Sequence, residues 1–183
     1  MKVVVAITAA SGAIYARQLL KMLIESAEVE RIAVIYSTNA RAVVAHEGET
    51  IPNSDKIEVF ENGDMFASPA SGSARWDAMV VVPSSVGTIG RVASGVSQTL
   101  IERAADVMLK ERRRLIFVVR ETPYSLIHLR NMTTLTEAGA VILPATPSFY
   151  SLPQSIEAVC QTVTERITAM LGLSGERYEW GKK

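Results

Sequence analysis

The first stretch whose residue types suit a binding site is the string of small residues TAASG at positions 8–12. It joins an apolar run, residues 3–7, to a helical pattern that begins near Ile14. Small side chains leave backbone N–H groups accessible, and N–H groups at the start of a helix can bind an anion. The string matches neither the Walker A motif nor the GxGxxG motif. Two interpretations therefore stay open: contact with a ligand, or close packing of the helix on a sheet.

Hydroxyl and charged groups follow two further apolar runs. The sequence SVGT at residues 85–88 comes after the run at residues 78–82, and Arg120 and Glu121 come after the run at residues 115–119. An arginine can hold an anion, and a glutamate whose pKa is raised by burial can move a proton. An ion pair that only caps the end of the sheet is the alternative interpretation.

A charged helical stretch covers residues 100–110. Glu102, Asp106 and Lys110 follow one another at intervals of four residues. Opposite charges at this spacing stabilise a helix by about 0.2–0.5 kcal/mol per pair, so the pattern predicts ion pairing along the helix. Arg103 lies on the neighbouring stripe, where either solvent or a ligand could be its partner.

The histidines and the single cysteine do not form a recognisable catalytic or metal site. His46 and His128 lack the spacing of zinc ligands with Glu47 and Glu49. His128 also falls inside a helical pattern, where it packs or caps, so a Ser-His-Asp triad is unsupported. Cys160 is in phase with apolar positions of the last helical pattern and is predicted to be buried in the core. We expect no metal.

These groups need a framework, and the apolar runs predict a sheet covered by helices on both faces. Five runs are continuous rather than alternating, as buried parallel strands are, at residues 3–7, 32–36, 78–82, 115–119 and 140–143. An edge strand is predicted at residues 57–60. Helical patterns lie at residues 14–26, 39–47, 87–113 (broken near 94–95), 123–138 with a proline at its start, and 153–171.

This order predicts an α/β fold with three layers, built on a doubly wound and mostly parallel sheet of the Rossmann or flavodoxin kind. We expect one domain over residues 1–183, with a tail at about 173–183 that could contact a neighbouring subunit. Ligands bind such sheets beyond the carboxyl ends of the strands. The loops that follow the five strands, at residues 8–11, 37–39, 83–88, 120–123 and 144–147, should therefore meet at one edge.

Composition excludes some classes of function. The 183 residues carry 19 basic and 19 acidic side chains, and this zero formal charge argues against nucleic acid as a main partner. No apolar run approaches the ~20 residues needed to span a bilayer, and the first apolar run is too short for a signal peptide. A lone cysteine suits a reducing compartment, so a cytoplasmic location is expected.

Six motifs, in order, resemble the UbiX-type flavin prenyltransferases, a family that shares its fold with cysteine decarboxylases. They are TAASGA at 8–13, PASGS at 69–73, LIERAADV at 100–107, LKERR at 109–113, RETP at 120–123 and GAVILPA at 139–145. The resemblance covers nearly the whole chain, and LIERAADV and RETP are its specific parts.

The resemblance implies an activity. Members of the family bind FMN and join the dimethylallyl group of dimethylallyl phosphate to N5 and C6 of reduced FMN. The resulting prenylated FMN serves a UbiD-type decarboxylase. The family uses no metal and forms large symmetric homo-oligomers, often dodecamers.

The resemblance also implies roles for individual residues. The flavin contacts fall on Ala9, Ala10, Ser11, Ser37, Ser85, Val86, Gly87, Thr88 and Arg120. The prenyl phosphate pocket falls on Glu47, Arg103, Lys110, Tyr150 and Arg166. The catalytic set is Glu121, Ser11 and Glu47, with Glu121 and Ser11 handling proton movement. Trp76 and Trp180 are candidates for the aromatic surface that would stabilise an allylic cation.

Two departures from the family pattern are Ala9, where glycine is common, and the pair Gln98-Thr99, where an asparagine-containing pair is usual. Two other functions remain open: an FMN-dependent cysteine decarboxylase, and a non-catalytic FMN-binding or assembly protein. A cysteine decarboxylase would need an active-site histidine, for which only His46 is a loose candidate. A carrier of FMN would not need a second phosphate pocket.

Overall fold

The sheet of this protein contains six parallel strands. The computed structural model describes residues 1–175, 177, 178 and 181. The strands are β1 (Lys2–Ile7), β2 (Arg31–Tyr36), β3 (Ile57–Glu61), β4 (Ala78–Ser84), β5 (Arg114–Val119) and β6 (Val141–Pro144). Their order is β3-β2-β1-β4-β5-β6, and every neighbouring pair is parallel. All six strands are confirmed: five follow the continuous apolar runs that a sheet covered on both faces requires, and β3 is the predicted edge strand, which is largely exposed.

The strand order reverses direction between β1 and β4. The chain builds outward from β1 to β3, then returns to place β4 on the other side of β1. At such a reversal the connections leave in opposite directions, and a crevice opens beyond the carboxyl ends of the two strands. The loops that follow Ile7 and Ser84 therefore border this crevice.

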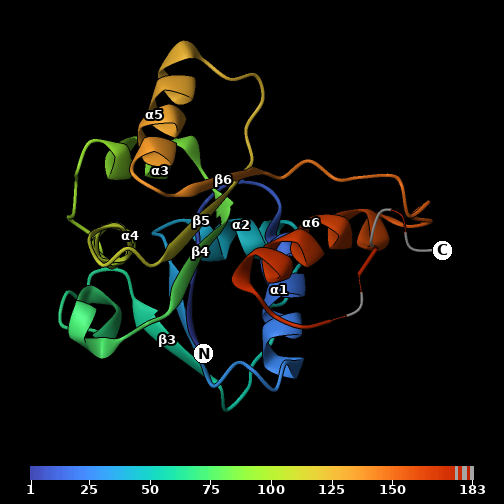
Figure 1. Ribbon diagram of the computed structural model, residues 1–183, viewed down its shortest axis with the longest axis horizontal. Coiled ribbons are helices and arrows are strands. Elements are labelled where there is room, and N and C mark those ends of the chain that lie inside the picture. The colour runs from blue at the N-terminus through green and yellow to red at the C-terminus, as the bar shows by residue number, and fades with distance from the viewer. Residues whose placement is uncertain (176, 179–180, 182–183) are drawn as a thin grey trace.

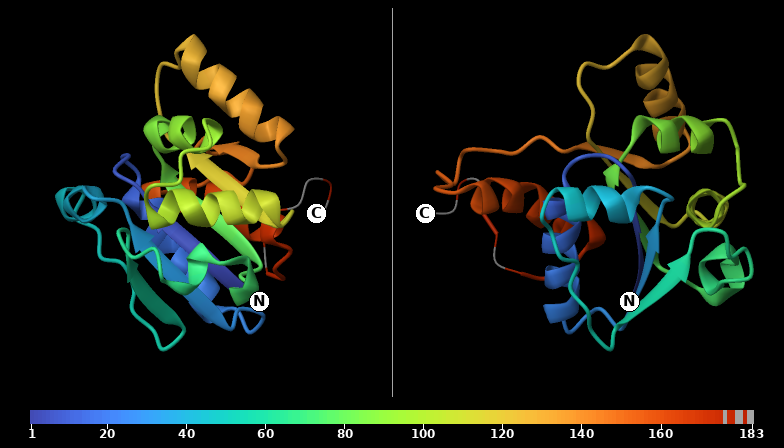
Figure 2. Two further views of the ribbon diagram at one scale, coloured as in Figure 1. Left: turned by 90° about the vertical axis from the view of Figure 1, so that its left-hand side faces the viewer. Right: turned by 180° about the vertical axis from the view of Figure 1, so that it is seen from behind.

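Helices cover both faces and complete the three layers that were predicted. They are α1 (Ala13–Glu25), α2 (Ala40–His46), α3 (Val86–Ala93), α4 (Leu100–Lys110), α5 (Leu126–Glu137) and α6 (Ile156–Leu171). Helices α1, α2 and α6 pack on one face of the sheet, and α3, α4 and α5 pack on the other. Figure 2 shows from two further sides that α5 lies against α3. Two short 3-10 turns, Ser68–Ala70 and Gly72–Ala74, lie beside α4.

Two helices begin three residues later than their prolines suggest. Helix α5 begins at Leu126, because the Ser125 side chain accepts from the His128 amide and the His128 ring accepts from the Ser125 amide. Ser155 caps α6 in a similar way. A side chain that satisfies free amides is a stronger start signal than a nearby proline. His128 therefore caps a helix.

The residues 173–183, expected to form a tail, lie partly outside the described residues. Among the helices that the structure describes, none combines the length and the apolar composition that crossing a bilayer requires.

Candidate active site

The loops after β1 and β4 are locked together by Thr8. Its hydroxyl donates to the carbonyl of Pro83 at 2.7 Å and accepts from the amide of Ser85 at 2.9 Å. The side chain is only 2% exposed, so both hydrogen bonds form in the absence of competing water. The two loops that border the predicted crevice therefore hold a fixed relation to each other.

A carboxylate from α2 occupies the start of α1. Both oxygens of Glu47 lie 3.0 Å from the amide of Gly12, and Oε2 accepts from the amide of Ala13 at 2.7 Å. These two amides have no partner within the helix, and the positive end of the helix dipole favours a negative charge beside them. At the amides of Gly12 and Ala13 the anion is therefore supplied by the chain itself, while contact of Ala9, Ala10 and Ser11 with a ligand stays a prediction.

Several groups keep Glu47 ionised. Burial alone would raise its pKa, but a hydrogen bond from Ser11, those from the amides of Ala13 and Gly12, and the charge of Arg120 outweigh burial and lower the pKa. Ser11 and Glu47, both in the catalytic set that the resemblance implies, are in hydrogen-bond contact. The guanidinium of Arg120 is close enough to this carboxylate to interact with it electrostatically.

The start of α3 forms the other wall. The hydroxyl of Ser85 accepts from the amide of Thr88 at 3.3 Å and lies 3.1 Å from the hydroxyl of Thr88. Gly87 is exposed and Val86 is half-buried. Arg91, one turn further on, donates to the Thr88 hydroxyl at 3.3 Å. Hydroxyls and uncapped amides therefore line this side of the crevice.

Arg91 continues this network into α4. Its Nε lies 2.5 Å from Oε1 of Glu102, whose side chain is 2% exposed. The other oxygen of Glu102 accepts hydrogen bonds from the amides of Gln98 and Thr99. The hydroxyl of Thr99 in turn accepts a hydrogen bond from the amide of Glu102, which completes a capping box. Burial alone would raise the pKa of the Glu102 carboxyl. The hydrogen bonds from Arg91 and from these two amides outweigh burial, so the pKa of Glu102 is lowered.

This arrangement corrects the predicted ion pairing along α4. Asp106 pairs with Arg103 rather than with Lys110, Lys110 pairs with Glu111, and Glu102 pairs with Arg91 of α3. The four-residue spacing was misleading because Glu102 faces α3 and not solvent. The signal that identifies it is the sequence T-L-I-E at residues 99–102, which is a capping box.

The remaining predicted flavin contacts lie at the same edge of the sheet. The Ser37 amide donates to the carbonyl of Ile7 at 2.9 Å, which fixes the end of β2 against the end of β1. Ala9 is exposed and Ala10 is buried. The topology thus gathers the whole predicted set at the carboxyl ends of β1, β2, β4 and β5: Ala9, Ala10, Ser11, Ser37, Ser85, Val86, Gly87, Thr88 and Arg120.

Arg120 and Glu121 follow β5 at this edge. The amide of Arg120 donates to the carbonyl of Ser84 at 3.2 Å, and its side chain is exposed. Glu121 is partly buried, and one of its oxygens accepts from the amide of Thr122 at 2.9 Å. No ion pair joins Arg120 to Glu121 among the described residues, so the alternative of a simple ion-pair cap is not what forms.

The predicted phosphate ligands on α4, Arg103 and Lys110, have partners of their own. Arg103 donates to the carbonyl of Ala70 at 3.0 Å and to Asp106 at 2.7 Å. Lys110 lies at the far end of the helix, with its ammonium 2.5 Å from Glu111. Both side chains remain partly exposed, at 34% and 46%. They could therefore reach a group outside their own chain.

Tyr150 and Arg166 form a second group on the other face of the sheet. The Tyr150 ring stacks on Tyr178 at a centroid distance of 6.5 Å. Arg166 lines an open cleft of about 150 Å³ together with Ser148, Thr162 and Tyr178. Its lining also includes the cation of Arg177 and the carboxylate of Glu165, so two cations and one anion face this cleft.

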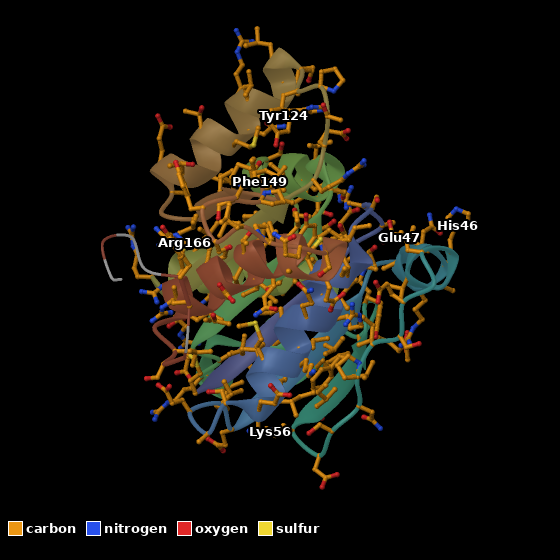
Figure 3. The ribbon with its side chains drawn as sticks, turned by 90° about the vertical axis from the view of Figure 1, so that its right-hand side faces the viewer. His46, Glu47, Lys56, Tyr124, Phe149 and Arg166 are labelled. Atoms are coloured by element: carbon orange, nitrogen blue, oxygen red, sulfur yellow. The ribbon has the colours of Figure 1, made fainter. Side chains whose placement is uncertain are left out.

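One chain does not assemble the whole predicted phosphate pocket. Helix α4, with Arg103 and Lys110, packs on the face opposite to α6, which carries Arg166. In Figure 3, Glu47 and Arg166 lie on opposite sides of the view. The family resemblance implies one pocket for these residues, whereas the fold of a single chain separates them into two groups.

Other predicted residues have mixed outcomes. Cys160 is a free, buried thiol whose pKa is raised by burial, as predicted. Trp76 is 2% exposed, and its indole N–H donates to Ser68 beside the amino end of β4, so it is not the expected aromatic surface at the site. Trp180 lies outside the described residues. The described part of the chain gathers no cluster of three or more potential metal ligands.

Comparison with known proteins places this arrangement in a family. The model of the family described as Flavoprotein matches residues 1–170. The flavin prenyltransferase UbiX of Methanocaldococcus jannaschii is 40% identical to the chain over 185 residues, which is 99% of each protein.

Two solved structures are similar over nearly the whole chain. One is AnUbiX in complex with FMN and dimethylallyl pyrophosphate, with a TM-score of 0.87, 41% identity and coverage of 99% of this chain and 98% of that one. The other is a dodecameric FMN-dependent UbiX-like decarboxylase from Escherichia coli O157:H7. It has a TM-score of 0.90, 34% identity and coverage of 98% and 99%.

Proposed function

The chain belongs to the flavin prenyltransferases of the flavoprotein family, and from that premise we propose that it joins the dimethylallyl group of dimethylallyl phosphate to N5 and C6 of reduced FMN. The observation that carries the proposal is the edge between β1 and β4, where exposed amides and hydroxyls meet the ionised Glu47 and the cation of Arg120. AnUbiX supports the choice of ligands, because its structure holds FMN with a dimethylallyl compound.

The residues at this edge fit a flavin nucleotide. Ala9, Ser11 and Gly87 are exposed and small, so a flat ring can approach the backbone there. Ser85 and Thr88 supply hydroxyls at the start of α3, and the amides of that helix favour an anionic or polar edge. Reduced FMN, when bound, supplies the nucleophilic ring atoms, while the chain supplies orientation and charge.

Proton movement falls to Ser11, Glu47 and Glu121. The hydroxyl of Ser11 donates to the ionised Glu47, so the Ser11 oxygen keeps lone pairs that can accept a proton from the ring edge. Glu47 then takes the proton that Ser11 passes on. Glu121 would accept the proton that leaves C6 as the bond between C6 and the dimethylallyl group forms.

The prenyl phosphate is held between copies of the chain. The sheet separates Arg103 and Lys110 from Tyr150 and Arg166 within one chain, so one pair would meet the other pair of a second copy. The dodecameric E. coli relative supports a homo-oligomer of this kind. Cations from both copies would stabilise the charge that develops on the departing phosphate.

The product would be handed to a UbiD-type decarboxylase in the cytoplasm. The single buried thiol of Cys160 suits a reducing compartment, which also favours reduced flavin.

Mass spectrometry of the released cofactor tests the proposal. The purified protein is given FMN, reduced without oxygen, and supplied with either dimethylallyl phosphate or dimethylallyl pyrophosphate. A flavin heavier by one prenyl unit establishes the transferase, and comparison of the two supplies identifies the substrate. Unmodified FMN that stays tightly bound would overturn the proposal and favour a cysteine decarboxylase or an FMN carrier, which turnover of a cysteine peptide would then distinguish.

A further inference from the structure

Two carboxylates two residues apart follow α2, and both contact α1. The turn that separates them is a complete helix-ending motif: the amide of Gly48 donates to the carbonyl of Ala45, and the amide of Glu49 donates to the carbonyl of Val44, each at 3.1 Å. Gly48 has a φ of 71°, which this motif requires and which glycine adopts readily. The turn therefore fixes the backbone of Glu47 relative to that of Glu49.

The second carboxylate is clamped to α1 by an arginine. Oε2 of Glu49 accepts from Nε of Arg17 at 2.5 Å, and Nη2 of the same arginine lies 2.7 and 2.9 Å from the two oxygens of Glu157 on α6. Gln18, beside Arg17, donates to the backbone carbonyl of Glu157 at 2.9 Å. One guanidinium thus joins α1, the turn after α2 and α6.

The ion pair of Arg17 with Glu49 is more sheltered than the exposed pair of Arg31 with Glu58. The side chains of Arg17 and Glu49 are 27% and 19% exposed, whereas Arg31 and Glu58, which pair across β2 and β3, are each 49% exposed. A guanidinium that binds two carboxylates fixes the orientation of both groups as well as the distances between them. The pair is therefore suited to holding the turn in one position.

We propose that Arg17 and Glu49 are positioning residues for Glu47. The turn carries Glu47 and Glu49 together, so fixing Glu49 on Arg17 keeps the Glu47 carboxylate on the amides of Gly12 and Ala13. The hydroxyl of Ser11 keeps its direction because it donates to that carboxylate. The consequence for prenyl transfer rests on the proposed function, while the consequence for the amides does not.

The test combines hydrogen exchange with single-turnover kinetics on the full chain. In Glu49→Ala, mass-detected exchange of a peptide that contains the amides of Gly12 and Ala13 should accelerate by about tenfold. Single-turnover prenylation of reduced FMN should slow by about 10- to 100-fold, because Ser11 and Glu47 lose their relative geometry. The concentration of dimethylallyl phosphate that gives half-maximal rate should change little. Arg17→Lys, which keeps the charge but not the forked guanidinium, should slow prenylation less than Glu49→Ala does.

The matched control is Arg31→Ala, which removes an exposed ion pair at the amino end of β2, at the opposite end of the sheet from the amides of Gly12 and Ala13. It should leave exchange at the two amides and the rate unchanged. If Glu49→Ala does not fold, Glu49→Gln, which keeps the size of the side chain, gives the same comparison.

Unchanged exchange at the two amides would overturn the proposal, and so would faster exchange with an unchanged rate. If the unsubstituted chain forms no prenylated flavin, the proposed function fails. Faster exchange in Glu49→Ala would then still support the positioning of Glu47, and unchanged exchange would still overturn it.

Discussion

The guanidinium of Arg91 on α3 lies 2.5 Å from the buried carboxylate of Glu102 on α4. Through Thr88 and Ser85, this pair reaches Thr8 at the end of β1. The start of α3, which the proposed function places beside the flavin, is therefore braced by a helix that carries the candidate phosphate ligand Arg103.

Removal of the charge on Glu102 should destabilise the protein. In Glu102→Gln the side chain keeps its size, but Arg91 loses its ion pair and the amides of Gln98 and Thr99 lose a charged acceptor. We expect the free energy of unfolding to fall by about 1–3 kcal/mol. Urea unfolding at one fixed protein concentration measures it. Glu58→Gln, from an exposed pair, should cost about 0–1 kcal/mol, and an equal loss in both variants would contradict this account.

Glu47 should give the protein a pH-dependent stability. Its pKa in the folded state lies below the ordinary value of 4.5, so the folded state binds fewer protons than the unfolded state in this region. Its contribution is fully present above pH 4.5 and is lost as the pH falls through the lowered pKa. Glu47→Gln should lower the free energy of unfolding by about 1–3 kcal/mol at pH 7. The gap between the two proteins should narrow below pH 4.5, and a gap that stays constant would refute this role.

Gly12 should not tolerate a side chain. Its φ is 112°, and a Cβ atom built there would lie 2.9 Å from Cδ2 of Tyr15, a buried ring. Gly12→Ala should therefore lower stability by about 1–3 kcal/mol and displace the amide that binds Glu47. Thermal unfolding of this variant can be compared with Gly63→Ala, where a Cβ atom meets nothing within 4 Å. Equal melting temperatures for the two variants would show that the loop can move aside.

Two variants that each weaken the binding of dimethylallyl phosphate should restore it when they are combined in one oligomer. If the prenyl phosphate lies between copies, Arg103→Ala and Arg166→Ala should each bind FMN normally but need about 10-fold more dimethylallyl phosphate, since a charge-assisted hydrogen bond is worth about 1.5–3 kcal/mol. Co-expression of the two should form oligomers in which some sites are intact. Recovery of the low requirement in a fraction of the sites is the expected result, and additive loss without recovery would place the pocket inside one chain.

Most of the fold could be predicted because its signals are local. The runs at β1, β2, β4 and β5 are continuous and apolar, and only burial on both faces of a sheet explains them. The predicted starts of α5 and α6 are three residues too early because each prediction relied on a proline, whereas the capping serines Ser125 and Ser155 fix the first turns. The capping box at residues 99–102 is a local signal that predicts the role of Glu102 better than the spacing of the charges does.

The site was predicted as a set of residues but not as an arrangement. Loops at strand ends could be named because parallel topology fixes their common edge. That Glu47 occupies the start of α1 depends on a contact between residues 35 positions apart, which no local pattern encodes. The separation of Arg103 from Arg166 depends on which face each helix covers. A family motif lists residues in one dimension and does not say which chain supplies them.

The carboxylate at the start of α1 bears on the speed of cofactor capture. Because Glu47 binds the amides of Gly12 and Ala13 and Thr8 joins Pro83 to Ser85, hydrogen bonds within the chain hold both ends of the loop after β1. A flavin that reaches it need not wait for the loop to order, which is the step that slows association when binding requires a conformational change. The association of FMN with this wall of the crevice should then be limited by diffusional encounter. The association rate constant should fall as solvent viscosity rises, and at constant viscosity it should depend only weakly on temperature.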